Sequence, residues 1–245
     1  MTLYSSTFYA TTRQLALSSA GVVLPMVYDL MHPLTPASVV DIGCGDGAWL
    51  SVAAKRGMPR LLGVDGSYVQ RADLLIAPTQ FHAADLRTSA GVNGRFDLAM
   101  CLEVAEHLPA SRADSLVKEL TDLAPVVLFS AAIPGQGGTE HINEQWPTYW
   151  SEKFASRGFA CVDALRPKLM TMPTQTVAWW YAQNLLLFVR DDRLPDYPRL
   201  HAAREHQPTP PACFVHPALY ENILKRSRRP GRTLVYDLRK KLKGG

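Results

Sequence analysis

Short runs of apolar residues recur along the chain and alternate with segments of helical spacing. Short apolar runs are typical of buried strands, whereas longer amphipathic segments, such as residues 112–123, are typical of helices. The pattern predicts strands at about 38–42, 61–64, 81–84, 96–102, 126–131, 160–165 and 183–189. Strands that alternate with helices favour an α/β fold.

One predicted strand runs directly into a glycine-rich turn at residues 39–47. Asp41 closes the strand, and Gly43, Gly45 and Gly47 follow at alternate positions. Glycines let the backbone bend sharply and bring bare N–H groups against a ligand at the start of the next helix. The dinucleotide fingerprint G-x-G-x-x-G has a different spacing. An ordinary tight connection between strand and helix is the alternative.

Three of the predicted strands end in an acidic residue, namely Asp41, Asp65 and Asp85. The carboxyl ends of parallel strands open onto one crevice, where α/β proteins bind ligands. Asp65 closes the second strand, where a Rossmann-like sheet places the acid that accepts both ribose hydroxyls. The alternative for Asp65 and Asp85 is a helix N-cap or a turn acid.

Two carboxylates and two imidazoles are predicted beside the same crevice. Glu103, Glu106 and His107 follow the fourth strand at helical spacing, which is expected to turn them to one side. The glycine-rich segment at 134–146 follows the fifth strand and delivers His141 to the same edge. This donor set suits a divalent ion. A metal-free general base, His107 or His141, and a structural role are the alternatives.

Composition and charge describe a globular chain with a basic end. With 47% hydrophobic and 20% charged residues, the 245-residue chain can bury a full core, and no apolar run is long enough to span a membrane. The four cysteines form no C-x-x-C pair, which favours a reduced, cytoplasmic location. Residues 225–245 hold nine basic residues against one acid. That end either contacts an anionic surface, such as nucleic acid or lipid, or is simply solvated.

The chain divides into three predicted parts. Residues 1–193 form the α/β domain, including a helix at 9–31 that caps the ligand pocket or packs beside it. Residues 194–212 contain five prolines and are expected to form an extended linker. Residues 213–245 form the basic appendage.

The glycine-rich turn and the acidic strand ends together resemble the class I S-adenosylmethionine-dependent methyltransferases, from about residue 39 to residue 189. The resemblance implies a Rossmann-like sheet of seven strands, the last two antiparallel, with helices on both faces, an N-terminal helical cap and a basic C-terminal appendage. It implies that the glycines shape the loop against the methionine part of the cofactor, Asp65 binds the ribose and Asp85 faces the adenine. The implied cofactor-binding residues are Asp41, Gly43, Cys44, Gly45, Gly47, Asp65, Gly66, Asp85, Leu86 and Leu102.

The E-x-x-E-H run that begins at Glu103, with the later His141, resembles the metal site of the small-RNA 2′-O-methyltransferases. The run itself also resembles the ubiquinone-pathway O-methyltransferases. This resemblance implies that Glu103, Glu106, His107 and His141 hold Mg²⁺ or a similar ion that acidifies the acceptor hydroxyl. Glu106, His107 and His141 would then be catalytic. Other class I methyltransferases carry a similar Glu-His-Leu without a metal, so the metal-free base remains open.

Over its full length the chain resembles a bacterial methyltransferase family common among polysaccharide and natural-product genes. The motifs that carry this resemblance lie at 24–25, 103–109, 129–138, 141–147, 165–167 and 179–184. It implies O-methylation of a sugar or glycosylated small molecule. The alternatives are metal-free N-methylation of a small amine and, from another class, a nucleic-acid or assembly-binding module that uses the basic tail. Trp179, Trp180 and Tyr181 either stack on the acceptor or pack in the core.

Overall fold

The computed structural model describes residues 6–227 and contains a seven-stranded sheet. The strands are β1 (Ser38–Ile42), β2 (Arg60–Asp65), β3 (Phe81–Ala83), β4 (Leu98–Leu102), β5 (Val126–Ser130), β6 (Phe159–Val162) and β7 (Leu186–Arg190). Their order is β3-β2-β1-β4-β5-β7-β6, with parallel pairing from β3 to β5 and antiparallel pairing of β7 with both neighbours. The seven-stranded α/β prediction is confirmed. From β1 the chain proceeds to β2 and β3 on one side and then to β4 and β5 on the other, so the strand order reverses between β1 and β4. In open α/β sheets the ligand crevice lies at the carboxyl ends of the strands at this point.

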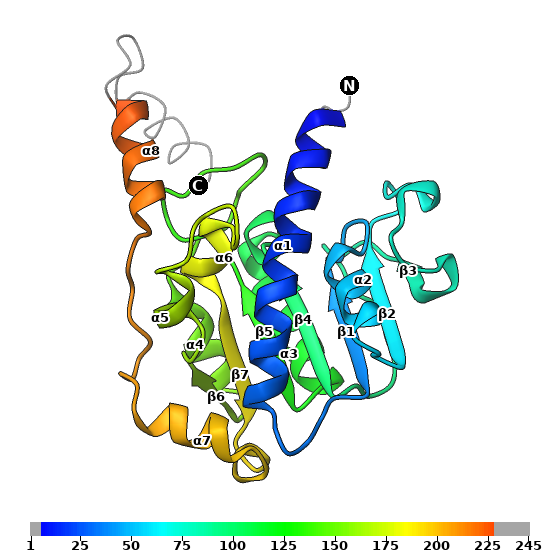
Figure 1. The fold of residues 1–245 in the computed structure, drawn as a ribbon, viewed down its shortest axis with the longest axis vertical. Helices are drawn as coiled ribbons and strands as arrows, with labels where there is room; N and C mark the ends of the chain where they lie inside the picture. Colours follow the sequence, from blue (N-terminus) through cyan, green and yellow to red (C-terminus); the bar gives the residue numbers. More distant parts are fainter. Residues whose placement is uncertain (1–5, 228–245) are drawn as a thin grey trace.

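Helices cover both faces of the sheet (Figure 1). They are α1 (Ser6–Leu30), α2 (Ala48–Lys55), α3 (Ala113–Leu123), α4 (Pro147–Ala155), α5 (Arg166–Leu169), α6 (Trp179–Asn184), α7 (Pro198–Glu205) and α8 (Pro217–Ser227), with 3₁₀ turns at Arg71–Asp73, Pro78–Gln80, Ala105–His107, Ala110–Arg112 and Leu194–Asp196. Successive strand residues point to opposite faces, so fully buried Val39 packs under α1 and α2, and Val40 under α3 and α4.

The first helix packs along one face and also reaches the glycine-rich turn. Ala16, Ala20 and Val27 lie on its buried side and join the same core as α2. The Nε atom of Arg13 lies 2.5 Å from an Asp46 carboxylate oxygen in the turn. The predicted N-terminal helix is therefore present, and it packs beside the crevice with one ionic contact to it.

The strand predictions hold closely for β1, β2, β3 and β5 and fail at the start of β7. Residues 183–185, expected in the last strand, lie in or directly after α6, and β7 begins at Leu186. Gln183 and Asn184 are polar yet buried, because their amides bond to one another and to Gln136. Apolar runs in a sequence do not reveal a buried amide network, because in the sequence the network appears only as two polar residues at a strand boundary.

The expected extended linker at 194–212 is wrong for much of its length. Pro198 is the first residue of α7, a position where the missing N–H of proline costs nothing. Leu200 of this helix is fully buried in the core, and the Gln207 side-chain amide donates to the Cys161 carbonyl of β6 at 2.7 Å. The prolines here start a helix rather than extend the chain. The division into domains stays a prediction.

Arg166 connects the segment that follows α7 to the residues at the end of β6. This fully buried guanidinium bonds to Asp163 (Nε to Oδ1, 2.8 Å), donates to the Ala212 carbonyl at 2.9 Å and lies 4.3 Å above the Phe214 ring. The chain then runs along the β6 side of the sheet to α8 (Figure 1). The basic residues after Ser227 lie outside the described residues. Within 6–227, no helix combines the length and apolarity needed to cross a bilayer.

Replacing Arg166 with leucine is expected to lower the free energy of unfolding by about 3–5 kcal/mol, because it leaves the buried Asp163 carboxylate without its cation. Urea denaturation measures the change. Arg193→Ala, which breaks a largely exposed pair with Asp196, is the matched control and should cost less than about 1 kcal/mol. Equal losses in the two variants would contradict the anchoring role.

Candidate active site

The glycine-rich turn between β1 and α2 has the backbone that its glycines require. Gly43, Gly45 and Gly47 have φ values of 85°, 56° and 83°, in the left-handed region that favours glycine. A Cβ on Gly43 would lie 2.2 Å from a Val104 methyl carbon, so this residue packs against the chain after β4. A Cβ on Gly45 would meet no described atom within 4 Å. The Gly45 side of the turn is therefore the side open to a ligand.

Asp65 lies at the end of β2 and accepts hydrogen bonds from the turn. Its Oδ2 accepts from the Gly45 N–H at 2.7 Å, and its Oδ1 accepts from the Gly66 N–H at 2.6 Å and from the Tyr68 hydroxyl. No sequence pattern marked Tyr68 as a site residue. The predicted ribose acid is thus next to the predicted cofactor turn, on neighbouring strands.

Asp41 is buried beneath the turn, and its Oδ1 has no hydrogen-bond partner among the described residues. Burial, followed by the nearby charge of Asp65, raises the pKa of Asp41 to about 7. Cys44 is also buried, and burial raises the pKa of its thiol, which favours a packing role.

The remaining predicted cofactor residues lie at the ends of β3 and β4. Asp85 is half exposed and its two oxygens accept from the Arg87 guanidinium at 2.9 Å, which holds the pKa of Asp85 below its usual range. Its contact with adenine stays a prediction. Leu86 and Leu102 are both buried.

Glu103 and Glu140 are the two non-glycine residues with positive φ in residues 6–227, at 56° and 59°. Strained backbone of this kind is typical of functional sites, where the surroundings hold it in place. The Glu103 N–H donates to the Ser130 carbonyl at 3.0 Å, and its carboxylate accepts from the Gln136 and Asn184 amides at 3.0 Å each. Burial nevertheless raises the pKa of Glu103.

Glu106, His107 and His141 form a cluster whose candidate ligand atoms all lie within 4.8 Å of one another. The two imidazole rings meet edge to face, with centroids 4.8 Å apart. Glu106 is fully buried, and neither carboxylate oxygen has a hydrogen-bond partner among the described residues. Burial, with a further contribution from the charge of Glu103, raises the pKa of Glu106 well above its usual value. Burial and the neighbouring His141 lower the pKa of His107, so its ring is neutral near pH 7.

A second carboxylate orients His141. Its Nδ1 lies 3.0 Å from a Glu144 oxygen, and Glu144 also accepts from the N–H groups of Gly135 (2.8 Å) and Gly137 (2.7 Å). The ring lies against Gly138, where a Cβ would be 2.2 Å from Nε2. A carboxylate that fixes one histidine nitrogen and presents the other is the usual support of a metal-bound histidine.

Of the four expected ligands, the three whose candidate ligand atoms lie within 4.8 Å of one another are Glu106, His107 and His141. A metal role for Glu103 stays a prediction. Helical spacing was expected to align Glu103 with Glu106, but the helical turn begins only at Ala105, as a 3₁₀ turn, and the left-handed backbone of Glu103 precedes it. The Glu103 carboxylate is instead held by amides. His-x-x-Glu spacing was the available signal for Glu144, whereas Gln136 and Asn184 lie in motifs that carry the family resemblance but had no role assigned to them.

Of the three aromatic residues expected to stack on an acceptor or pack in the core, only Trp179 and Trp180 are partly accessible. Tyr181 is buried, and its hydroxyl accepts from the Trp49 indole N–H at 3.3 Å, with the rings edge to face at 5.1 Å. It therefore packs in the core. Trp179 and Trp180 are half buried.

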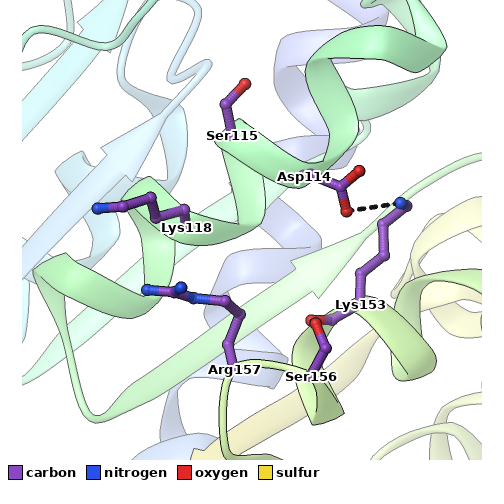
Figure 2. Close-up of a pocket in the computed structure, with 6 residues that line it drawn as sticks. All are labelled: Asp114, Ser115, Lys118, Lys153, Ser156 and Arg157. Atoms are coloured by element: carbon purple, nitrogen blue, oxygen red, sulfur yellow. Dashed lines mark hydrogen bonds and ion pairs between the residues drawn. The ribbon is translucent and has the colours of Figure 1, made fainter.

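A separate hollow lies between α3 and α4 (Figure 2). It is lined by Asp114, Ser115, Lys118, Lys153, Ser156 and Arg157. Lys153 bonds to Asp114 at 2.7 Å, and Lys118 and Arg157 each pair with Asp122. No candidate site residue lines it, so this is a charged surface apart from the site.

Comparisons with known proteins agree with this geometry. A family model described as a methyltransferase domain matches residues 25–163. No curated protein matches the chain. Among solved structures, a methyl-donor-bound amino pentose methyltransferase from Micromonospora echinaspora, involved in calicheamicin biosynthesis, has a TM-score of 0.55 at 18% identity, over 78% of this chain and 99% of that one.

Two further structures have the same fold. A sugar N-methyltransferase from a Streptoalloteichus species has a TM-score of 0.57 at 14% identity, over 78% of this chain and 96% of that one. The magnesium protoporphyrin IX methyltransferase of Synechocystis PCC 6803 has a TM-score of 0.50 at 22% identity, over 74% of this chain and 80% of that one.

The sheet order, the glycine-rich turn and the acid that closes β2 define a class I S-adenosylmethionine-dependent methyltransferase. The chain belongs to the methyltransferase-domain family whose model covers more than half of its length.

Asp65→Ala is expected to weaken S-adenosylhomocysteine binding at least about tenfold, because hydrogen bonds to a charged group contribute about 1.5–3 kcal/mol each. Calorimetric titration measures the change. Asp114→Ala, at the separate hollow, is the control and should bind like the wild type. An Asp65→Ala variant with unchanged affinity would exclude the ribose role.

Proposed function

We propose that the enzyme O-methylates a sugar or glycosylated small molecule and holds a divalent metal between Glu106, His107 and His141. The proposal of a metal site rests on the Glu106 carboxylate. This carboxylate is fully buried, has no hydrogen-bond partner among the described residues and lies beside two imidazoles. A buried charge without a partner is costly, and one carboxylate with two imidazoles suits a divalent cation. The support of His141 by Glu144 agrees with such a site.

The sugar acceptor is proposed from the resemblance to polysaccharide and natural-product methyltransferases. Two of the structural neighbours are named as acting on sugars, which is compatible with it. One of them is named an N-methyltransferase, so metal-free N-methylation of a small amine remains the second candidate. The two candidates differ in their need for the cluster to hold a metal, which makes metal binding the discriminating measurement.

Methyl transfer requires the acceptor oxygen to lie in line with the methyl–sulfur bond and to lose its proton. A divalent ion supplies Lewis acidity that lowers the pKa of the acceptor hydroxyl. With His107 as a ligand, the proton would pass to solvent water; in the metal-free alternative, the His107 ring, whose pKa burial lowers, accepts it. Glu144 holds the His141 ring in one orientation, and the Gln136 and Asn184 amides hold the Glu103 carboxylate. The electrons of the broken carbon–sulfur bond stay on sulfur, which leaves S-adenosylhomocysteine.

Glu106→Gln is expected to weaken Mn²⁺ binding about 10- to 100-fold, because it removes the charged ligand of the cluster. Titration of Mn²⁺ into the protein loaded with S-adenosylhomocysteine measures the affinity. Asp114→Asn, at the separate hollow between α3 and α4, is the control and should retain Mn²⁺ affinity. Chelator should abolish methyl transfer and leave S-adenosylhomocysteine binding intact. Full activity in chelator would overturn the metal and favour the second candidate.

Gly138→Ala tests the placement of His141 without altering a ligand. Its Cβ would lie 2.2 Å from Nε2, so the ring must move, while the φ of Gly138 lies outside the left-handed region and accepts alanine. We expect Mn²⁺ affinity to fall about tenfold or more, as when the support of a metal ligand is disturbed. Gly21→Ala, with no described atom within 4 Å of its Cβ, is the control. Unchanged affinity in Gly138→Ala would argue against His141 as a ligand.

A further inference from the structure

The Asp65 carboxylate has little hydrogen-bonding capacity left in this structure. A carboxylate offers about four lone-pair positions on its two oxygens. Oδ1 already accepts from the Gly66 N–H and the Tyr68 hydroxyl, and Oδ2 accepts from the Gly45 N–H. About one position therefore remains, on Oδ2.

The ribose of the cofactor brings two hydroxyl donors to this acid, a step that rests on the proposed ribose role of Asp65. Two donors cannot be accommodated by one remaining position, so one present donor has to leave. The N–H groups of Gly45 and Gly66 belong to the backbone of the turns, so they cannot move away from Asp65 unless the turns change their backbone conformation. The Tyr68 hydroxyl ends a side chain that is 73% exposed and can rotate.

The position of the Tyr68 ring also depends on the glycine beside Asp65. A Cβ on Gly66 would lie 2.1 Å from Cε1 of the ring, far inside van der Waals contact. Gly66 is not among the glycines with positive φ, so its backbone would accept alanine. Any side chain at residue 66 would therefore move the ring away from this pose.

We propose that the Tyr68 hydroxyl occupies a ribose-hydroxyl position on Asp65 in the cofactor-free enzyme and is displaced when the ribose binds. The tyrosine keeps the carboxylate paired and oriented while the site is empty. Cofactor binding then includes the cost of breaking the bond between Tyr68 and Asp65.

Removal of this hydroxyl therefore strengthens cofactor binding. Tyr68→Phe should bind S-adenosylhomocysteine at least about tenfold more tightly in calorimetric titration, which corresponds to one hydrogen bond to a charged carboxylate that no longer has to be broken. Gly66→Ala, which expels the ring, should shift affinity in the same direction. Tyr220→Phe removes a hydroxyl from another exposed tyrosine, on α8, and should leave the affinity unchanged.

An analogue lacking the 2′-hydroxyl separates displacement from any general effect of the substitution. S-(2′-deoxyadenosyl)homocysteine needs only the one remaining position, so the gain from Tyr68→Phe should disappear for it. Equal or weaker binding of S-adenosylhomocysteine by Tyr68→Phe would overturn the proposal, and so would an equal gain for the deoxy analogue. If the wild type bound no S-adenosylhomocysteine, the cofactor role of the whole turn would fail with it, which is a different result.

Discussion

The site depends on the burial of carboxylates at the carboxyl ends of β1 and β4. Asp41, Glu103 and Glu106 are all placed where water is largely excluded, and burial is the largest influence on the pKa of each. Desolvation of a carboxylate costs several kcal/mol unless hydrogen bonds or a cation compensate. How each acid is compensated therefore indicates its role.

The three acids are compensated differently. Glu103 accepts hydrogen bonds from the side-chain amides of Gln136 and Asn184. Beneath the cofactor turn, one carboxylate oxygen of Asp41 has no hydrogen-bond partner among the described residues. Beside the imidazoles, both carboxylate oxygens of Glu106 lack such a partner. Glu103 and Glu106 therefore differ in how their burial is compensated, although they are only three residues apart.

The amide network around Glu103 extends to the C-terminal segment. The side-chain amide of Gln183 donates to Gln136 and Asn184, and its oxygen, Oε1, accepts from the His216 N–H at 2.8 Å. Residues just before α8 therefore support the site, so truncation before His216 removes part of that network. From charge and proline content, residues 194–212 were predicted to be a linker and residues 213–245 an appendage. Composition indicates solvation and chain stiffness, but it does not show which backbone groups a buried amide will bind.

Local signals predicted the sheet and the cofactor turn well, because apolar runs and glycine spacing act over a few neighbouring residues. Three of the four residues predicted to lie together, Glu106, His107 and His141, do lie together. His141 lies next to Glu106 because the Ile142 and Asn143 N–H groups both donate to the Glu106 carbonyl, at 2.8 and 3.0 Å. These bonds join segments 36 residues apart, and the positive φ of Glu140 turns the chain into them. A sequence can place a histidine after the fifth strand, but long-range backbone bonds of this kind decide which carboxylate it meets.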